Sequence, residues 1–253
     1  MMENILEVRE ASKSFGGIKA LDNVNVNINK GSIIGLIGPN GSGKTTLFNV
    51  VTGFYPPDSG EIIFQGKRID GLNPNEVFSL GLVRTFQIPR LFNRLTVLEN
   101  MLIPNPEQDD ENPLKALRRK SWQQQEISLT RKALELIKIF GIEGFENSRV
   151  SELSAAYMKL IETARSIMGG AKMLLLDEPA AGVNYATAKD VFEHIKMLRE
   201  KYGLTLFIIE HRIEVLLDYV DYVYVLNLGR MLAEGTPKEV RENRKVIETY
   251  IGE

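Results

Sequence analysis

The sequence contains one stretch whose residue types and spacing suit the binding of phosphate. The segment "GPNGSGKT", residues 38–45, fits the pattern G-x-x-x-x-G-K-[ST], and it lies between an apolar run, "SIIGLIG", and a stretch with helical character. Glycines allow tight turns, so that successive backbone N–H groups and a helix N-terminus can surround an anion. The sequence therefore predicts a nucleotide-binding loop. The other interpretation, a glycine-rich turn with a chance lysine, does not explain the strand before the loop or the helix after it.

The side chains of this loop have separate roles in the prediction. Lys44 would bring positive charge to the β- and γ-phosphate oxygens, the Thr45 hydroxyl would ligate Mg²⁺, and Thr46 would reach the α-phosphate. The residues predicted to bind the nucleotide here are Gly38, Pro39, Asn40, Gly41, Ser42, Gly43, Lys44, Thr45 and Thr46.

Two further segments place polar side chains at the ends of apolar runs. "MLLLDE" ends in Asp177 and Glu178, and "FIIEH" ends in His211. In a parallel sheet the carboxyl ends of strands share one edge, so these groups are expected beside the loop. Asp177 would hold Mg²⁺ through a water, Glu178 would orient and polarise the attacking water, and His211 would contact the γ-phosphate. The alternatives are two exposed carboxylates at a strand end and a solvated or structural histidine.

The elements that must position these residues can be expected from hydrophobic patterning. Val24, Val26 and Ile28 alternate with asparagines, which predicts a half-exposed antiparallel strand. "SGEIIFQGKRI" indicates another edge strand and turn, and "LTLFIIEH" a second buried strand. Residues 186–203 show an amphipathic pattern that ends at Gly203, residues 221–235 suggest a hairpin, and residues 236–253 suggest short helices. Strands alternating with helices predict an α/β fold with a mainly parallel sheet and an antiparallel edge subdomain.

Residues 88–170 differ in character and predict an inserted helical subdomain. Thr96 and Glu99 have the spacing of a capping box. Leu129, Ala133 and Phe140 lie on one face of an amphipathic helix over 122–140. The Pro-rich and charged segment 104–120 is expected to form an exposed insertion.

Composition narrows the function classes. The 253 residues carry a net charge of −2, which argues against a nucleic-acid partner, and the absence of cysteine excludes disulfides, thiol catalysis and Cys-ligated zinc. No apolar run approaches the ~20 residues that span a bilayer. The N-terminal segment "MMENILEVRE" lacks the apolar core of a signal peptide, so none is expected. A role at a membrane would therefore depend on a partner.

In this order and spacing the motifs resemble those of the ATP-binding subunits of ABC transporters over essentially the whole chain. "GPNGSGKTT" resembles the Walker A motif, "MLLLDEP" Walker B with its catalytic glutamate, "AAGVN" the D-loop, and His211 the switch histidine. Gln87 resembles the Q-loop glutamine, which in the family touches Mg²⁺ and relays the nucleotide state to membrane subunits. Phe15 has the place of the aromatic residue that stacks on adenine, although a core phenylalanine is the other interpretation. The resemblance implies a P-loop NTPase core formed by 1–87 and 171–253, with 88–170 as the helical subdomain of a single ABC ATPase domain spanning 1–253.

A closer resemblance is to the ATPase subunits of branched-chain amino-acid importers. It is carried by "GLVRTFQIPRLFNRLTVLEN", "LDEPAAGVN", "IIEHRIEVL" and the ending "AEGTPKEVRENRKVIETYIGE". The resemblance implies an ATPase using ATP and Mg²⁺, peripheral on the cytoplasmic face of the inner membrane. It would work with integral-membrane permease subunits, a second ATPase subunit and an extracytoplasmic solute-binding protein. The ATPase of a lipopolysaccharide-type exporter and a non-transport ABC ATPase are the alternatives.

One segment departs from the family pattern. The signature Leu-Ser-Gly-Gly-Gln, which in the family contacts the γ-phosphate held by the opposite subunit, reads here Leu153, Ser154, Ala155, Ala156, Tyr157. Ser154 keeps the hydroxyl and the helix N-terminus keeps its N–H groups, but the close approach of glycine is lost. Three interpretations stay open: a tolerated change with a reduced rate, a degenerate half-site in a heterodimer, or a purely structural segment.

Overall fold

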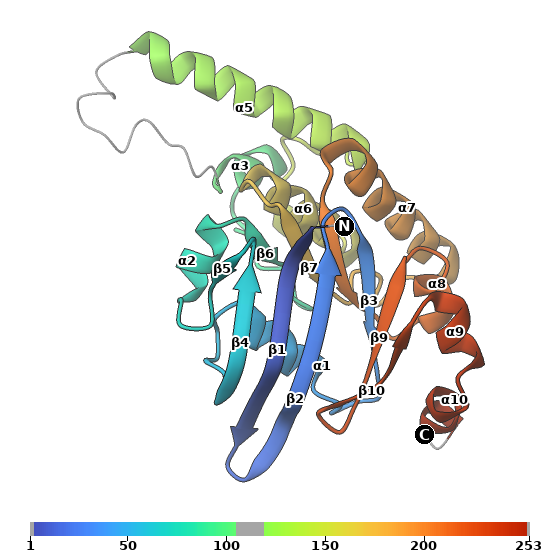
Figure 1. Cartoon of the computed structure of the whole chain (residues 1–253). Coiled ribbons are helices and arrows are strands. Elements are labelled where there is room, and N and C mark those ends of the chain that lie inside the picture. Colours follow the sequence, from blue (N-terminus) through green and yellow to red (C-terminus); the bar gives the residue numbers. More distant parts are fainter. Residues whose placement is uncertain (1–2, 105–118, 252–253) are drawn as a thin grey trace. The chain divides into compact units, whose positions relative to one another are not determined.

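The structure is a computed structural model that describes residues 3–104 and 119–251. The chain divides into two compact units: unit 1 comprises Met1–Gln87 and Lys172–Glu253, and unit 2 comprises Ile88–Ala171 (Figure 1). Most of the insertion expected at 104–120 lies outside the described residues.

Unit 1 contains a mainly parallel sheet. Its strands are β3 (Ile33–Ile37), β6 (Leu82–Arg84), β7 (Met173–Asp177), β8 (Thr205–Ile209), β9 (Tyr222–Asn227) and β10 (Arg230–Gly235). They lie in the order β10-β9-β3-β8-β7-β6, and all neighbours are parallel except the β9–β10 hairpin. Every residue of β3, β7 and β8 is buried, as expected for apolar runs in a sheet covered on both faces. The carboxyl ends of β3, β8, β7 and β6 therefore open onto one edge.

The second sheet of unit 1 is antiparallel and has the order β2-β1-β4-β5. It is formed by β1 (Asn4–Phe15), β2 (Ile18–Asn29), β4 (Ser59–Phe64) and β5 (Lys67–Arg68). The alternation predicted for residues 24–28 is confirmed, since Val24, Val26 and Ile28 are fully buried. The segment 59–69, expected as an edge strand and turn, forms β4, a turn and β5, but β4 is not an edge strand because it pairs with both β1 and β5. The long strand β1 was not expected from the sequence.

One apolar core joins both sheets and α1 (Lys44–Val51). The helix contributes Leu47, Phe48, Val50 and Val51 to a cluster that also holds residues of β1, β2, β3, β7 and β8. The side chain of Tyr224 in β9 links the mainly parallel sheet to the edge strand β2 of the antiparallel sheet. Its hydroxyl donates to Asn27 O at 2.8 Å and accepts from Asn27 N–H at 2.9 Å. Burial of this hydroxyl raises the pKa of Tyr224 to about 12. The helix that follows the phosphate-binding segment is thus anchored in a close-packed core.

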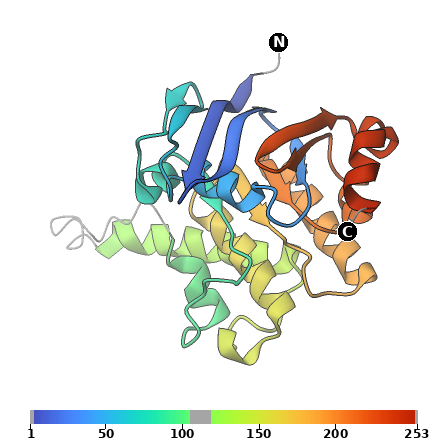
Figure 2. The same cartoon turned by 90° about the horizontal axis from the view of Figure 1, so that it is seen from below.

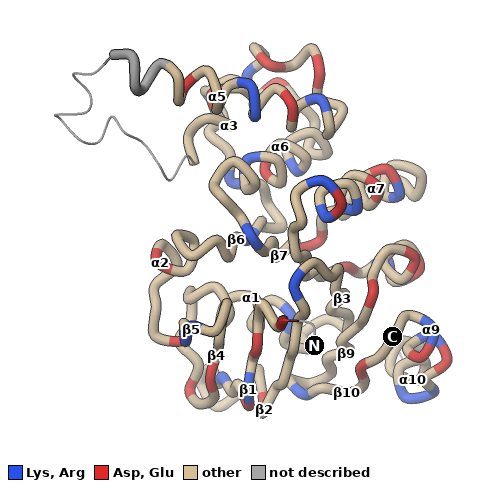
Figure 3. The backbone as a smooth tube through the Cα atoms, turned by 45° about the horizontal axis from the view of Figure 1, so that its top comes forward, with Lys and Arg blue, Asp and Glu red and all other residues tan. Residues whose placement is uncertain are grey.

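The other helices of unit 1 are α2 (Pro74–Ser79), α7 (Tyr185–Tyr202), α8 (Ile213–Leu216), α9 (Pro237–Glu242) and α10 (Arg244–Ile251). The amphipathic pattern of α7 is confirmed: its buried residues are Ala188, Val191, Phe192, Ile195 and Leu198, and Gly203 ends it in the left-handed conformation at φ 63°. Basic and acidic residues are interspersed along the length of α7 (Figure 3). The short C-terminal helices were also expected, and both pack against β10 (Figure 2).

Unit 2 is helical in its described part. It contains α3 (Val97–Leu102), α5 (Arg119–Ile139), the 3-10 turn η2 (Val150–Glu152) and α6 (Ala155–Met168), and α3, α5 and α6 pack on one another. The capping box at the start of α3 is confirmed, with reciprocal hydrogen bonds between Thr96 and Glu99. In α5, Ala133, Leu136, Ile137 and the following Phe140 are buried as expected, while Leu129 is half-buried.

Candidate functional site

The segment predicted to bind phosphate connects β3 to α1. Gly38 has φ +153° and Gly43 has φ +107°, and an added Cβ would meet Leu226 O at 2.0 Å or Ala20 O at 2.5 Å. Both positions therefore require glycine, on grounds of conformation and of space. Gly43 is the N-cap of α1, and no side chain caps this helix N-terminus. The local geometry leaves the first N–H groups of α1 to be satisfied by an acceptor such as phosphate.

The lysine of this loop folds back over it. Lys44 is 6% exposed, and its ammonium donates to Gly38 O at 2.7 Å and to Pro39 O at 2.9 Å. The positive charge is thus held inside the turn, within the reach of an anion that enters it. On the same turn Thr45 is exposed and Thr46 is half-buried.

Three predicted residues meet at the carboxyl ends of neighbouring strands. Glu178 follows β7, His211 lies two residues beyond β8, and Gln87 lies three beyond β6. His211 Nε2 lies 2.9 Å from Glu178 Oε1, and Gln87 Nε2 donates to Glu178 Oε2 at 3.1 Å. The two carboxylate oxygens are therefore oriented by two different side chains. A carboxylate held in this way can accept a proton from a water and direct it.

The backbone at Glu178 is unusual. Its φ is +53°, a left-handed conformation that residues with a Cβ adopt rarely, while its N–H still donates to Ile209 O at 2.9 Å. The chain thus leaves extended geometry at the residue after Asp177. Such conformations concentrate at functional sites, where the surrounding structure holds them.

Asp177 does not meet the same groups as Glu178. Its Oδ2 accepts a hydrogen bond from Arg84 Nη2 at 2.7 Å, and both side chains are at most 6% exposed. Sequence reasoning did not single out Arg84. The available signal was a charged residue at the end of the short apolar run "LV" in front of Gln87.

A second missed residue is Glu210, which separates β8 from His211. It is 2% exposed, and its carboxylate accepts from the backbone N–H groups of Ala180 at 3.2 Å and His211 at 3.0 Å. Glu210 therefore ties the segment after Glu178 to the segment that carries His211. A carboxylate directly after a fully apolar strand was the signal in the sequence.

Phe15 ends β1 with an exposed ring, 42% accessible. It contacts the ring of Tyr55 edge-on, with centroids 5.2 Å apart, and the Lys13 ammonium lies 5.6 Å from its centroid. The interpretation of Phe15 as a core residue is wrong, because its side chain is exposed. An exposed aromatic ring is available to stack on a planar ligand.

Ser154 belongs to unit 2 and caps α6. Its hydroxyl accepts from Tyr157 N–H at 3.5 Å, and Ser154 and Ala155 are exposed. Tyr157 is half-buried and its ring packs on Phe145, with centroids 5.0 Å apart. The segment therefore presents a serine hydroxyl and a methyl group at a helix N-terminus.

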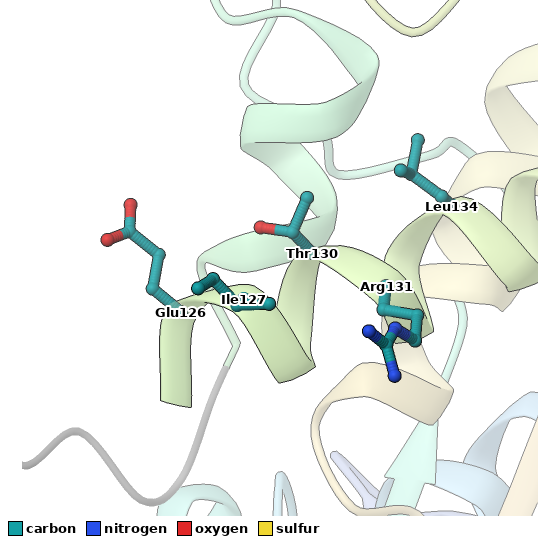
Figure 4. Close-up of a pocket in the computed structure, with 5 residues that line it drawn as sticks. All are labelled: Glu126, Ile127, Thr130, Arg131 and Leu134. Carbon is teal, nitrogen blue, oxygen red and sulfur yellow. The ribbon is translucent and has the colours of Figure 1, made fainter. Parts of the chain in front are cut away.

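Unit 2 also has a surface hollow of about 650 Å³ on α5. Its lining side chains are Glu126, Ile127, Thr130, Arg131 and Leu134 (Figure 4). None of these is a predicted site residue, so this hollow is distinct from the groups described above.

Comparison with known proteins identifies the family. A model of the ABC transporter family matches residues 21–181, more than half of the chain. The chain belongs to this family. A second model, described as a branched-chain amino acid ATP-binding cassette transporter, matches residues 230–253.

Individual relatives and solved structures match nearly the whole chain, not only the part that the family model covers. The probable branched-chain amino acid transport ATP-binding protein LivG of Methanocaldococcus jannaschii is 42% identical, with 98% of each chain covered. The crystal structure of the ADP conformation of an ATP-binding cassette of an ABC transporter is 40% identical with a TM-score of 0.84, covering 99% of this chain and 100% of that one. The structure of a dimeric bacterial ABC transporter cassette is 25% identical with a TM-score of 0.75, and the match covers 92% of this chain and 98% of that one.

These findings confirm the predicted fold class and activity. The chain is an α/β ABC cassette that binds ATP and hydrolyses it. Among the described helices, none has the length and apolar character that crossing a membrane requires.

Proposed function

We propose that this ABC ATPase drives a membrane importer of branched-chain amino acids. The observation that best supports the activity is the position of the Glu178 carboxylate, which contacts both His211 and Gln87. These residues and the phosphate-binding loop all follow strands that end at the same edge of the sheet. The substrate class is supported by the match at residues 230–253 and by the name of the full-length relative. In this proposal residues 1–253 act as one ABC ATPase domain, with 88–170 as its helical subdomain.

The proposed chemistry assigns roles to the residues of the site. Gly38–Thr46 hold the phosphates, with Lys44 on the β- and γ-oxygens, and Phe15 stacks on adenine. Glu178 orients and polarises the attacking water, and His211 contacts the γ-phosphate. Catalysis then rests on positioning and on stabilisation of charge. Ser154 would contact nucleotide held by a second ATPase subunit, and the dimeric cassette of similar fold supports such a pairing.

The donors around the loop suit Mg²⁺. The described residues contain no cluster of three or more His, Cys, Asp or Glu side chains suited to a metal. The oxygen donors available to a metal ion are the hydroxyl of the exposed Thr45, the carboxylate of Asp177 and the side-chain amide oxygen of Gln87. The amide nitrogen of Gln87 donates to Glu178, so its amide oxygen is left to bind a metal. Mg²⁺ prefers oxygen donors and is commonly held by one or two carboxylates together with substrate phosphates. When bound, the ion would neutralise charge on the β- and γ-phosphates.

The proposal includes partners and a location. In this proposal the chain works with integral-membrane permease subunits and lies peripherally on the cytoplasmic face of the inner membrane, and the transport role named for the full-length relative supports it. An extracytoplasmic solute-binding protein would deliver the amino acid.

Copurification from native membranes tests this proposal. We expect permease subunits to copurify with the chain, and ATP hydrolysis by the complex to rise when leucine, isoleucine or valine is supplied with the binding protein. Lipid-exporting permeases among the copurified proteins would favour the exporter instead. A chain that copurifies with no membrane subunit would contradict transport.

A further inference from the structure

Arg84 is a buried cation that the activity described above does not use. It ends β6, and Asp177 ends the neighbouring parallel strand β7. The Arg84–Asp177 hydrogen bond of 2.7 Å joins side chains that are 5% and 6% exposed. Water can therefore screen this pair only weakly, and the interaction is stronger than that of a surface ion pair.

The guanidinium of Arg84 is also fixed by its other contacts. Nη1 donates to Asn49 Oδ1 of α1 at 2.5 Å. The guanidinium carbon lies 5.5 Å from the centroid of the Phe48 ring and 5.2 Å from that of Phe86. Nε is buried and has no hydrogen-bond partner among the described residues. Two rings, an amide and one carboxylate thus hold the cation, and Asp177 is the anion that it pairs with.

This pair has a consequence for the metal. A carboxylate that accepts from a guanidinium at 2.7 Å already has a full positive charge beside it. A divalent cation that approaches Asp177 must then overcome repulsion from Arg84, at a place where burial limits screening. The β- and γ-phosphates of a nucleotide would add negative charge and ligands that offset this repulsion.

We propose that Arg84 is the resident counterion of Asp177 and makes divalent-metal binding at this site depend on nucleotide. The inference rests on the proposed role of Asp177 as a Mg²⁺-binding residue. Arg84 acts through Asp177, so it is a positioning residue. The tie to Asn49 also links the carboxylate to the helix that begins at the phosphate-binding loop.

Direct metal binding tests this inference. Mn²⁺ is titrated into the purified full chain, with and without ADP, and free Mn²⁺ is followed by electron paramagnetic resonance. For wild type we expect weak binding without ADP and clearly tighter binding with it. Arg84→Met should bind Mn²⁺ without ADP about ten-fold or more tightly than wild type, because it removes a neighbouring buried charge. Arg84→Lys, which keeps the charge, should stay close to wild type.

Two controls isolate the effect. Arg199→Met removes one positive charge at a more exposed pair, with Asp221, and should leave Mn²⁺ affinity unchanged. Asp177→Asn added to Arg84→Met should abolish the gain. Thermal unfolding monitors folding, and Arg84→Gln replaces Arg84→Met if the latter is unfolded, with the same expectation.

The outcomes separate this inference from the proposed function. If Asp177→Asn weakens ADP-dependent Mn²⁺ binding but Arg84→Met and Arg84→Gln bind Mn²⁺ no more tightly than wild type, the counterion role is wrong and the metal assignment stands. If Asp177→Asn has no effect on Mn²⁺ binding with ADP, the metal role of Asp177 is itself wrong, and the inference falls with it.

Discussion

At the scale of single residues, the chemistry of this cassette depends on how Glu178 is held. Its two oxygens meet His211 and Gln87, side chains that come from the ends of two different strands. The backbone at Glu178 is left-handed, with φ +53°. Three strand ends and a constrained backbone thus fix the direction in which one carboxylate points, which is what a base that positions a water requires.

Replacement of this carboxylate should separate binding from hydrolysis. Glu178→Gln keeps the shape of the side chain but removes its basicity, so steady-state phosphate release should fall by about 10²-fold or more. ATP affinity, measured by equilibrium titration, should stay close to that of wild type because Lys44 and the loop are intact. Glu234→Gln, at an exposed glutamate of β10, is the matched control. Turnover of Glu178→Gln close to that of the control would show that another group is the base.

At the scale of elements, the N-terminus of α6 is where the sequence departs from its family. Ser154 caps the helix, while Tyr157 packs on Phe145 within unit 2. The helix N-terminus thus keeps its capping hydroxyl, and what differs from the family signature is Ala155, Ala156 and Tyr157, of which the two alanines each add one methyl group. The steric interpretation of a reduced rate concerns these two methyl groups alone.

Glycines at these positions test the steric interpretation. Steady-state ATPase of the chain alone should be low, and Ala155→Gly combined with Ala156→Gly should raise it, because a phosphate can approach glycine more closely. Each glycine costs roughly 1 kcal/mol of helix stability at most, so thermal unfolding should be recorded beside activity. If the double variant is folded and its ATPase does not rise, the methyl groups are not what limits the rate.

His194 of helix α7 should make the stability of the fold depend on pH. Burial lowers the pKa of His194 despite the neighbouring Asp190 and Glu193. The unfolded chain therefore binds more protons than the folded one once the pH falls towards the ordinary histidine pKa of about 6.5. This histidine contributes stability above that pH and loses it as the pH falls towards its lower folded-state pKa.

His194→Gln should consequently flatten the decline of the unfolding free energy between about pH 7 and pH 5, where a histidine of ordinary pKa titrates. Urea unfolding at several pH values measures it. Lys196→Gln, on the exposed face of the same helix, controls for the loss of a basic side chain. An equally steep pH dependence in His194→Gln and in wild type would contradict the assigned role of His194.

The elements also show what the sequence could predict and what it could not. The apolar runs at 33–37 and 173–177 and the amphipathic helix before Gly203 were predicted, because their patterns follow from burial on two faces or on one. The strand at 4–15 was missed because its polar residues interrupt the alternation and because register shifts break its pairing. Arg84 and Glu210 were missed because their partners lie far away in the sequence, at Asp177 and Ala180, and no local pattern reports such pairs.

At the scale of the whole molecule, strand order explains why distant motifs converge. The strands β3, β8, β7 and β6 are parallel neighbours, so the loop at 38–45, His211, Glu178 and Gln87 follow strands that end at the same edge of unit 1. Such an edge is where α/β proteins bind their ligands. The proposed transport function adds partners to this arrangement, because hydrolysis by a cassette moves a solute only when it is coupled to membrane subunits.

ATP-driven uptake by the reconstituted complex tests this central claim most directly. Permease subunits that copurify with the chain are placed in proteoliposomes with ATP on the side of the cassette, and uptake of labelled leucine is measured with the binding protein present. We expect uptake that requires ATP and is lost in Glu178→Gln. Uptake that continues at the wild-type rate in Glu178→Gln, or ATP hydrolysis by a folded complex without movement of leucine, isoleucine or valine, would contradict the account.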